Sequence, residues 1–97
     1  MLNVYNIGME FEYDTYKSES NKLKHGISFD DAKILWLSDN VVLPAIIKDE
    51  IRHMIIGPIG NALYSCIFTM RERKTRIISC RRSREKERRI YNEAIEK

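Results

Sequence analysis

The second half of the chain contains four strand-like segments that follow one another with only turns between them. The segments are Val41–Ile47, Arg52–Ile56, Leu63–Met70 and Thr75–Cys80. Each is rich in β-branched residues or alternates apolar and polar side chains. Links this short join antiparallel strands, because a parallel pair needs a crossover of about a dozen residues or more. The sequence therefore predicts a small antiparallel sheet, a meander of about four strands, with Pro44 marking the first as an edge strand.

A polar tip, Arg71–Lys74, joins the last two of these segments into a hairpin. If the hairpin is centred on Arg73, Cys66 pairs with Cys80 and both side chains lie on the core face. A cytosolic chain keeps such thiols reduced and packed as small apolar groups. We therefore expect two buried, reduced thiols and no catalytic cysteine.

Two helices are predicted before the sheet, after a short strand at Met9–Tyr13. Asp14 is a typical N-cap for a helix from Thr15 to Lys24, and Gly26 can adopt the left-handed conformation that ends it. Ser28 is the N-cap of the second helix. The buried stripe of that helix contains Phe29, Ala32, Leu35 and Trp36.

A third helix is predicted at the C-terminus, with Ser83 as its N-cap. Its narrow apolar face contains Ile90, Tyr91, Ala94 and Ile95. The Gly57–Asn61 stretch, with two glycines and a proline, predicts a turn. The predicted fold class is α+β, with two N-terminal helices and one C-terminal helix covering one face of the antiparallel sheet.

The 97 residues fit one domain, 1–97, with one modest core. A hydrophobic fraction of 43% excludes a disordered chain. The longest apolar run, Val41–Ile47, is far shorter than the ~18 residues of a membrane span. Met1–Glu12 contains no Lys or Arg, so it does not resemble a secretory signal. We expect a cytoplasmic protein with no membrane partner.

The charge is distributed unevenly along the chain. Residues 1–70 hold 6 Lys/Arg and 9 Asp/Glu, whereas residues 71–97 hold 11 Lys/Arg and 5 Asp/Glu. The basic C-terminal part attracts a polyanion or an acidic partner protein. The alternative interpretation is a solvated helix face with no partner.

Three groups of residues, in order along the chain, resemble the signature of one known family. The first is Phe11-Glu12-Tyr13-Asp14, Lys17, Asn21, Lys24-His25-Gly26, Ser28-Phe29 and Ala32; the second is Glu50-x-Arg52 with Ile56-Gly57; the third is Arg76-Ile77-Ile78-Ser79-Cys80-Arg81-Arg82, Glu87-Arg88 and Tyr91. This ordered set is similar to the signature of the BrnT toxin family. Tyr13 and Ser83 stand where that pattern usually has Trp and Ala.

The resemblance implies a RelE-like fold and a ribonuclease toxin of a type II toxin–antitoxin pair, whose RNA cleavage blocks translation. It also implies a cognate antitoxin of the BrnA kind in a 2:2 complex, with DNA contacted only through the antitoxin. The antitoxin would cover the basic surface of Arg81, Arg82 and the last helix. The residues themselves leave open a second function, a non-catalytic nucleic-acid-binding or regulatory module that acts with a DNA-binding partner.

Arg81 and Arg82 are the strongest candidates for a catalytic role. They end the last strand just before a helix N-terminus, and a guanidinium can hold a phosphate through two hydrogen bonds. Successive strand residues point to opposite faces, so only one of the two arginines can serve a given site. The other is then structural or contacts the antitoxin.

His25, Lys24 and Tyr91 complete the candidate catalytic set. An imidazole can act as base or acid near neutral pH, and Lys24 can bind phosphate. The alternative for His25 is a simple partner of the helix dipole, because it lies in the last turn of a helix. Analogy with RelE-like enzymes gives Tyr91 an acid/base role, whereas its place on an apolar helix face favours a packed ring.

Four further arginines are candidates for RNA binding: Arg71, Arg76, Arg84 and Arg88. Opposite Thr75 in the hairpin, Arg71 would lie roughly 20 Å from Arg81, too far to share one phosphate. It would line an extended RNA groove or only solubilise the hairpin. The two His and two Cys lack the spacing of metal ligands, so we predict no metal and no other cofactor.

Overall fold

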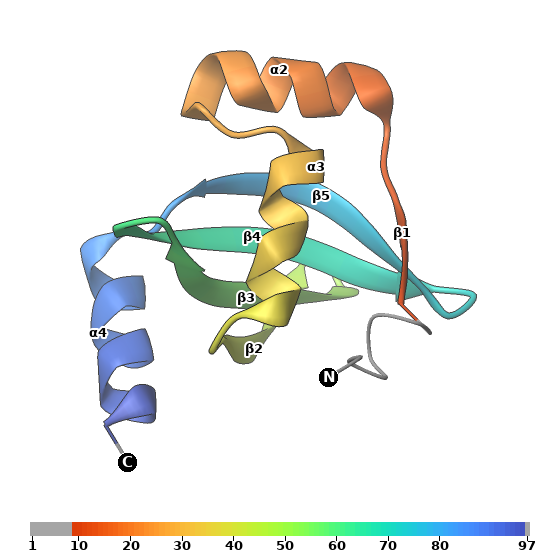
Figure 1. The fold of residues 1–97 in the computed structure, drawn as a ribbon. Helices are drawn as coiled ribbons and strands as arrows, with labels where there is room; N and C mark the ends of the chain where they lie inside the picture. The colour runs from red at the N-terminus through yellow and green to blue at the C-terminus, as the bar shows by residue number, and fades with distance from the viewer. Residues whose placement is uncertain (1–8, 97) are drawn as a thin grey trace.

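The computed structural model describes residues 9–96 and is shown in Figure 1. Its elements are β1 (Glu10–Glu12), α2 (Thr15–His25), α3 (Phe29–Ala32), the 3₁₀ helix η1 (Lys33–Leu37), β2 (Val41–Ile47), β3 (Glu50–Ile59), β4 (Ala62–Arg71), β5 (Lys74–Arg82) and α4 (Glu85–Ile95). One five-stranded sheet has the order β1-β5-β4-β3-β2. The α+β class and the meander from β2 to β5 are confirmed, and β1 adds a strand parallel to β5 that makes the sheet mixed.

The segment Met1–Glu12, predicted not to be a secretory signal, lies mostly outside the described residues. Within residues 9–96, no helix has both the length and the apolar character that a membrane span needs.

Local capping signals define the helices before the sheet. The Asp14 carboxylate accepts hydrogen bonds from the first turn of α2, and Gly26 ends that helix with a φ of 77°. The Ser28 hydroxyl accepts from the backbone N–H of Asp31 at the start of α3. These three predicted caps are confirmed. The second predicted helix, however, is α-helical for one turn only and continues as the 3₁₀ helix η1.

Gly57, Pro58 and Ile59 lie inside β3, so the predicted turn at Gly57–Asn61 is confirmed only in its last two residues. The chain turns only at Gly60 and Asn61. A Cβ atom on Gly57 would lie 3.1 Å from the Ser38 hydroxyl and 3.2 Å from a methyl group of Leu35. The glycine allows the segment after η1 to approach the strand closely, and it has no part in reversing the chain.

The β4–β5 hairpin turns at Glu72 and Arg73, which both have positive φ. This two-residue turn pairs Arg71 with Lys74, so the predicted pairing of Arg71 with Thr75 is wrong. A register shift at Ile67/Phe68 then moves the pairing by one residue and sets Cys66 opposite Cys80. The predicted position of the cysteine pair is confirmed, and both side chains are fully buried. They form a disulfide, contrary to the predicted reduced thiols.

The main core lies between the sheet and the segment that contains α3 and η1. Its buried residues are Ile27, Phe29, Ala32, Leu35, Ile55, Cys66, Phe68, Ile77 and Cys80. Figure 1 shows α3 and η1 crossing the strands, α2 beside β5, and α4 at the end of the sheet where β5 stops.

Helix α4 packs against the other face of the sheet, so the prediction that the helices share one face is wrong. Its residue Glu87 bonds Ser65 and Arg81, which alternate along their strands with the core cysteines. The helix begins one residue later than predicted, with Arg84 as N-cap. Ser83 is unavailable as a cap because its buried hydroxyl lies 2.7 Å from that of Ser65.

Candidate nucleic-acid interface

A groove between α2 and β5 contains Lys24 and His25, two of the predicted catalytic residues. It has a volume of about 220 Å³. Its lining consists of Lys17, Ser20, Asn21, Lys24 and His25 from α2, Phe29 from α3, and Ile78 and Ser79 from β5. We call it the α2–β5 groove. Figure 1 shows α2 beside β5, on the side of the sheet away from β2.

Asn21 attaches α2 to the edge of β5 in the way a neighbouring strand would. Its side-chain amide donates to the carbonyl of Cys80 at 2.8 Å and accepts from the N–H of Cys80 at 3.2 Å. The same amide group donates to the carbonyl of Ile27 at 2.8 Å. Lys17 and Lys24 lie one helical turn before and after Asn21, so they share its side of the helix. The hydrogen bonds of Asn21 fix the position of α2 on β5 and therefore the shape of the groove.

The cationic side chains of the groove are exposed and available to an anion. Lys17, Lys24 and His25 form no ion pair with any residue of the range 9–96. The C-terminal end of α2 carries a partial negative charge, which repels phosphate. A phosphate in this groove must therefore be held by the side chains and not by the helix dipole.

Arg82 is a further exposed cation at the end of β5, outside the lining of the α2–β5 groove. It follows Cys80 by two residues, so its side chain leaves the strand on the same face as Cys80. The residue is exposed and forms no ion pair among the described residues. Its guanidinium is available to a phosphate.

Arg81 leaves the opposite face and is already bound to a carboxylate. Its two terminal nitrogens donate to the two oxygens of Glu87 at 2.7 and 2.8 Å. Glu87 also accepts from the Ser65 hydroxyl and from the backbone N–H of Arg84, both at 2.9 Å. The hydrogen bond from Arg81 is the main reason that the pKa of Glu87 falls to about 2, and the same bond raises the pKa of Arg81. Arg81 thus joins β5 to α4.

Tyr91 anchors the same helix from its buried face. Its hydroxyl donates to the backbone carbonyl of Asp39 at 2.8 Å. Burial raises the pKa of Tyr91, and the nearby charge of Asp39 raises it further. Of the predicted catalytic residues, the structure therefore brings Lys24 and His25 into one groove. Arg81 and Tyr91 instead hold α4.

The predicted RNA-binding arginines have separate environments. Arg71 is exposed at the end of β4, and Arg76 lies 3.6 Å from the Glu12 carboxylate. Arg84 is the exposed N-cap of α4, and Arg88 donates to the carbonyl of Ser83 at 2.6 Å. These arginines belong to two regions, the β1–β4–β5 end of the sheet and α4, and none of them lines the α2–β5 groove.

The residue-based prediction of the site omitted Lys17, Ser20 and Ser79, which also line the groove. The sequence pattern that indicates Lys17 is helical spacing: Lys17, Asn21 and Lys24 follow one another at intervals of four and three residues, so they lie on one face of a helix. Nothing local marks Ser79, since its place depends on how α2 lies on β5. Residues 9–96 also contain no group of three or more His, Cys, Asp or Glu side chains suited to a metal ion.

The chain is thus a small α+β protein whose α2–β5 groove sets two lysines and a histidine beside one strand. Residues 13–87 match the family model of the ribonuclease toxin BrnT of type II toxin–antitoxin systems. The match covers most of the chain, and the chain belongs to this family. No curated protein gives a significant match to the sequence. Family membership implies a ribonuclease toxin with an antitoxin partner.

Proposed function

We propose that the chain is a metal-independent endoribonuclease of RelE-like fold that blocks translation, and that a BrnA-like antitoxin neutralises it in a 2:2 complex in the cytoplasm. The observation that supports the RNA site is the α2–β5 groove, which places His25 among lysines that form no ion pair with a carboxylate of residues 9–96. Each of Arg76 and Arg81, by contrast, has a carboxylate partner.

The chemistry assigned to this groove is attack by a ribose 2′-hydroxyl on the adjacent phosphorus. His25 takes the hydroxyl proton, and Lys17, Lys24 and Arg82 hold the charge that builds on the phosphorane. The bond from phosphorus to the 5′-oxygen breaks, and that oxygen leaves with a proton from solvent. The products are a 2′,3′-cyclic phosphate and a 5′-hydroxyl. Every group in this scheme comes from the chain, the RNA or water.

The first prediction is that the purified chain cleaves single-stranded RNA in EDTA as fast as in Mg²⁺, and stops protein synthesis in a cell-free extract. Gel analysis of a defined RNA measures the first effect, and labelled amino-acid incorporation measures the second. Loss of cleavage in EDTA would contradict the mechanism. RNA binding without any cleavage would instead support the non-catalytic nucleic-acid-binding module.

The second prediction separates the two neighbouring arginines. We expect Arg82→Ala to slow RNA cleavage by about 10²-fold while the melting temperature stays within about 2 °C. Arg81→Ala leaves Glu87 without its main partner, so it lowers the melting temperature by about 10 °C. Cleavage assays and thermal melts of both variants test this. The assignment fails if Arg82→Ala cleaves normally or if Arg81→Ala melts like the wild type.

A further inference from the structure

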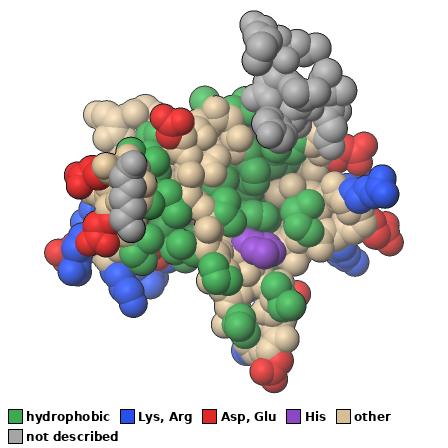
Figure 2. Space-filling view, turned by 90° about the horizontal axis from the view of Figure 1, so that it is seen from below, with side chains coloured by type: hydrophobic (Ala, Val, Ile, Leu, Met, Phe, Trp, Pro, Cys, Tyr) green, Lys and Arg blue, Asp and Glu red, His purple; other side chains and the backbone are tan. Residues whose placement is uncertain are grey.

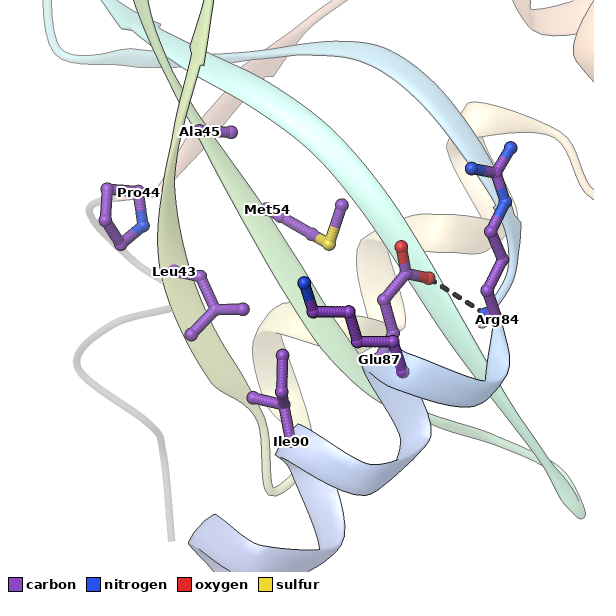
Figure 3. A pocket seen from close by; sticks show the side chains of 8 residues that line it. Leu43, Pro44, Ala45, Met54, Arg84, Glu87 and Ile90 are labelled. Atoms are coloured by element: carbon purple, nitrogen blue, oxygen red, sulfur yellow. Dashed lines mark hydrogen bonds between the residues drawn. The ribbon is translucent and has the colours of Figure 1, made fainter.

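A second groove lies between the edge of the sheet and α4, and Figure 3 shows it from close by. Its volume is about 300 Å³. Its lining consists of Leu43, Pro44 and Ala45 from β2, Met54 from β3, and Arg84, Lys86, Glu87 and Ile90 at α4. We call it the β2–α4 groove. The labelled side chains of Leu43, Met54 and Ile90 gather between the strands and the helix in that view.

The β2–α4 groove combines an apolar floor with a basic rim. Leu43, Met54 and Ile90 are half-buried and supply the floor. Arg84 and Lys86 are exposed at the rim and form no ion pair with residues 9–96. The one carboxylate of the lining, Glu87, is already neutralised by Arg81. The groove therefore favours a partner that carries apolar side chains flanked by acidic ones.

Hydrophobic side chains gather on the side of the molecule that holds this groove (Figure 2). Figure 2, seen from below, shows hydrophobic side chains over the middle of this side and charged side chains toward its margins. On the β2–β3 hairpin, Ile46 and Ile51 are 75% and 70% exposed, but strand alternation places them on the face opposite Leu43 and Met54. The hairpin therefore exposes apolar side chains beside the groove without lining it, and such exposure is typical of interaction surfaces. Pro44 stands at the centre of β2, which favours packing on side chains over addition of another strand.

We propose that the β2–α4 groove is the docking site of the antitoxin, which would insert an amphipathic, acidic segment between β2 and α4. This inference rests on the family assignment for the existence of an antitoxin. A second copy of the chain fits less well, because a symmetric contact would bring Arg84 and Lys86 close to the same residues of the other copy. RNA fits less well too, because the lining offers no aromatic ring for a base to stack on.

This docking site is distinct from the proposed RNA site. The two grooves share no lining residue, and they involve opposite edges of the meander, β2 and β5. Antitoxin capture and RNA cleavage are therefore separable by mutation. A variant in the β2–α4 groove escapes the antitoxin and still cleaves RNA, whereas a variant in the α2–β5 groove is captured and inactive.

The third prediction tests this with the cognate antitoxin that the family assignment implies, separated from the co-expressed complex and titrated calorimetrically. We expect Leu43→Glu to weaken binding at least 30-fold and Lys86→Glu to weaken it about tenfold. The controls are Leu23→Glu, at a leucine that is 89% exposed on α2, and Lys22→Glu on the same helix. Both controls should bind normally. The exposed Lys86 keeps the test valid even if Leu43→Glu fails to fold, which circular dichroism reports.

Three results would overturn the docking site. The first is that Lys86→Glu and folded Leu43→Glu bind the antitoxin with unchanged affinity. The second is that the α2 controls weaken antitoxin binding as much as the groove variants do. The third is that light scattering shows the groove variants losing a toxin dimer while their affinity for the antitoxin is unchanged. RNA cleavage is measured on the same samples. If no sample cleaves RNA but the groove variants still lose the antitoxin, the proposed ribonuclease site is wrong and the docking site stands.

Discussion

Replacing His25 by alanine is expected to slow RNA cleavage by about 10²–10⁴-fold, because the variant loses the proposed proton acceptor. The side chain is exposed at the C-terminal end of α2 and has no hydrogen-bond partner among residues 9–96. The fold should therefore tolerate the change. Cleavage of a defined RNA under single-turnover conditions measures the effect, and a thermal melt confirms that the variant is folded.

The second histidine provides a matched control for this experiment. His53 lies in β3, where its ring contacts the ring of Phe68 at 5.3 Å between centroids. Its removal can lower stability, but the cleavage rate of the folded protein should change little. Equal loss of cleavage in His53→Ala and His25→Ala, or normal cleavage in His25→Ala, would move the site away from the α2–β5 groove.

Replacing Glu87 by glutamine is expected to lower the free energy of unfolding at pH 7 by about 2–3 kcal/mol. For a chain of this size that corresponds to a melting temperature lower by roughly 10–20 °C. The carboxylate is only 13% exposed and accepts bonds from Arg81, Ser65 and the backbone of Arg84. Solvent therefore screens it weakly, and glutamine cannot match its charge.

The pH dependence of this loss follows from the direction of the pKa shift. The pKa of Glu87 falls from 4.5 to about 2 on folding, so its ionised form stabilises the protein above pH 4.5. That stabilisation disappears as the pH falls from 4.5 through 2. Urea unfolding of the wild type and Glu87→Gln across this range should show a gap that closes at low pH.

Another glutamate of the same helix gives the control for Glu87. Glu85 is 79% exposed and lies 4.0 Å from Arg89. Glu85→Gln should change the free energy of unfolding by less than about 0.5 kcal/mol, as is usual for surface ion pairs. A gap between wild type and Glu87→Gln that stays constant with pH would show that the carboxylate charge is not the cause.

Features of this fold that depend on neighbouring residues are encoded locally in the chain. Asp14, Gly26 and Ser28 define helix ends because their partners lie within a few positions along the chain. Alternation and short links likewise predict the β2–β5 meander. The motif residues Lys17, Asn21 and Lys24 already share one helical face, so a cationic stripe was readable before any fold was known.

Features that depend on residues distant in sequence follow instead from the packing of helices on the sheet. Gly57 is in a strand because Leu35 and Ser38 approach it, and Ser83 is not a cap because Ser65 binds its hydroxyl. The two arginines at the end of β5 look equivalent in sequence. Packing of α4 on one face gives Arg81 a carboxylate partner, while Arg82 on the other face stays exposed. Side-chain partners across a sheet are set by how helices pack on it, and local sequence carries no record of that packing.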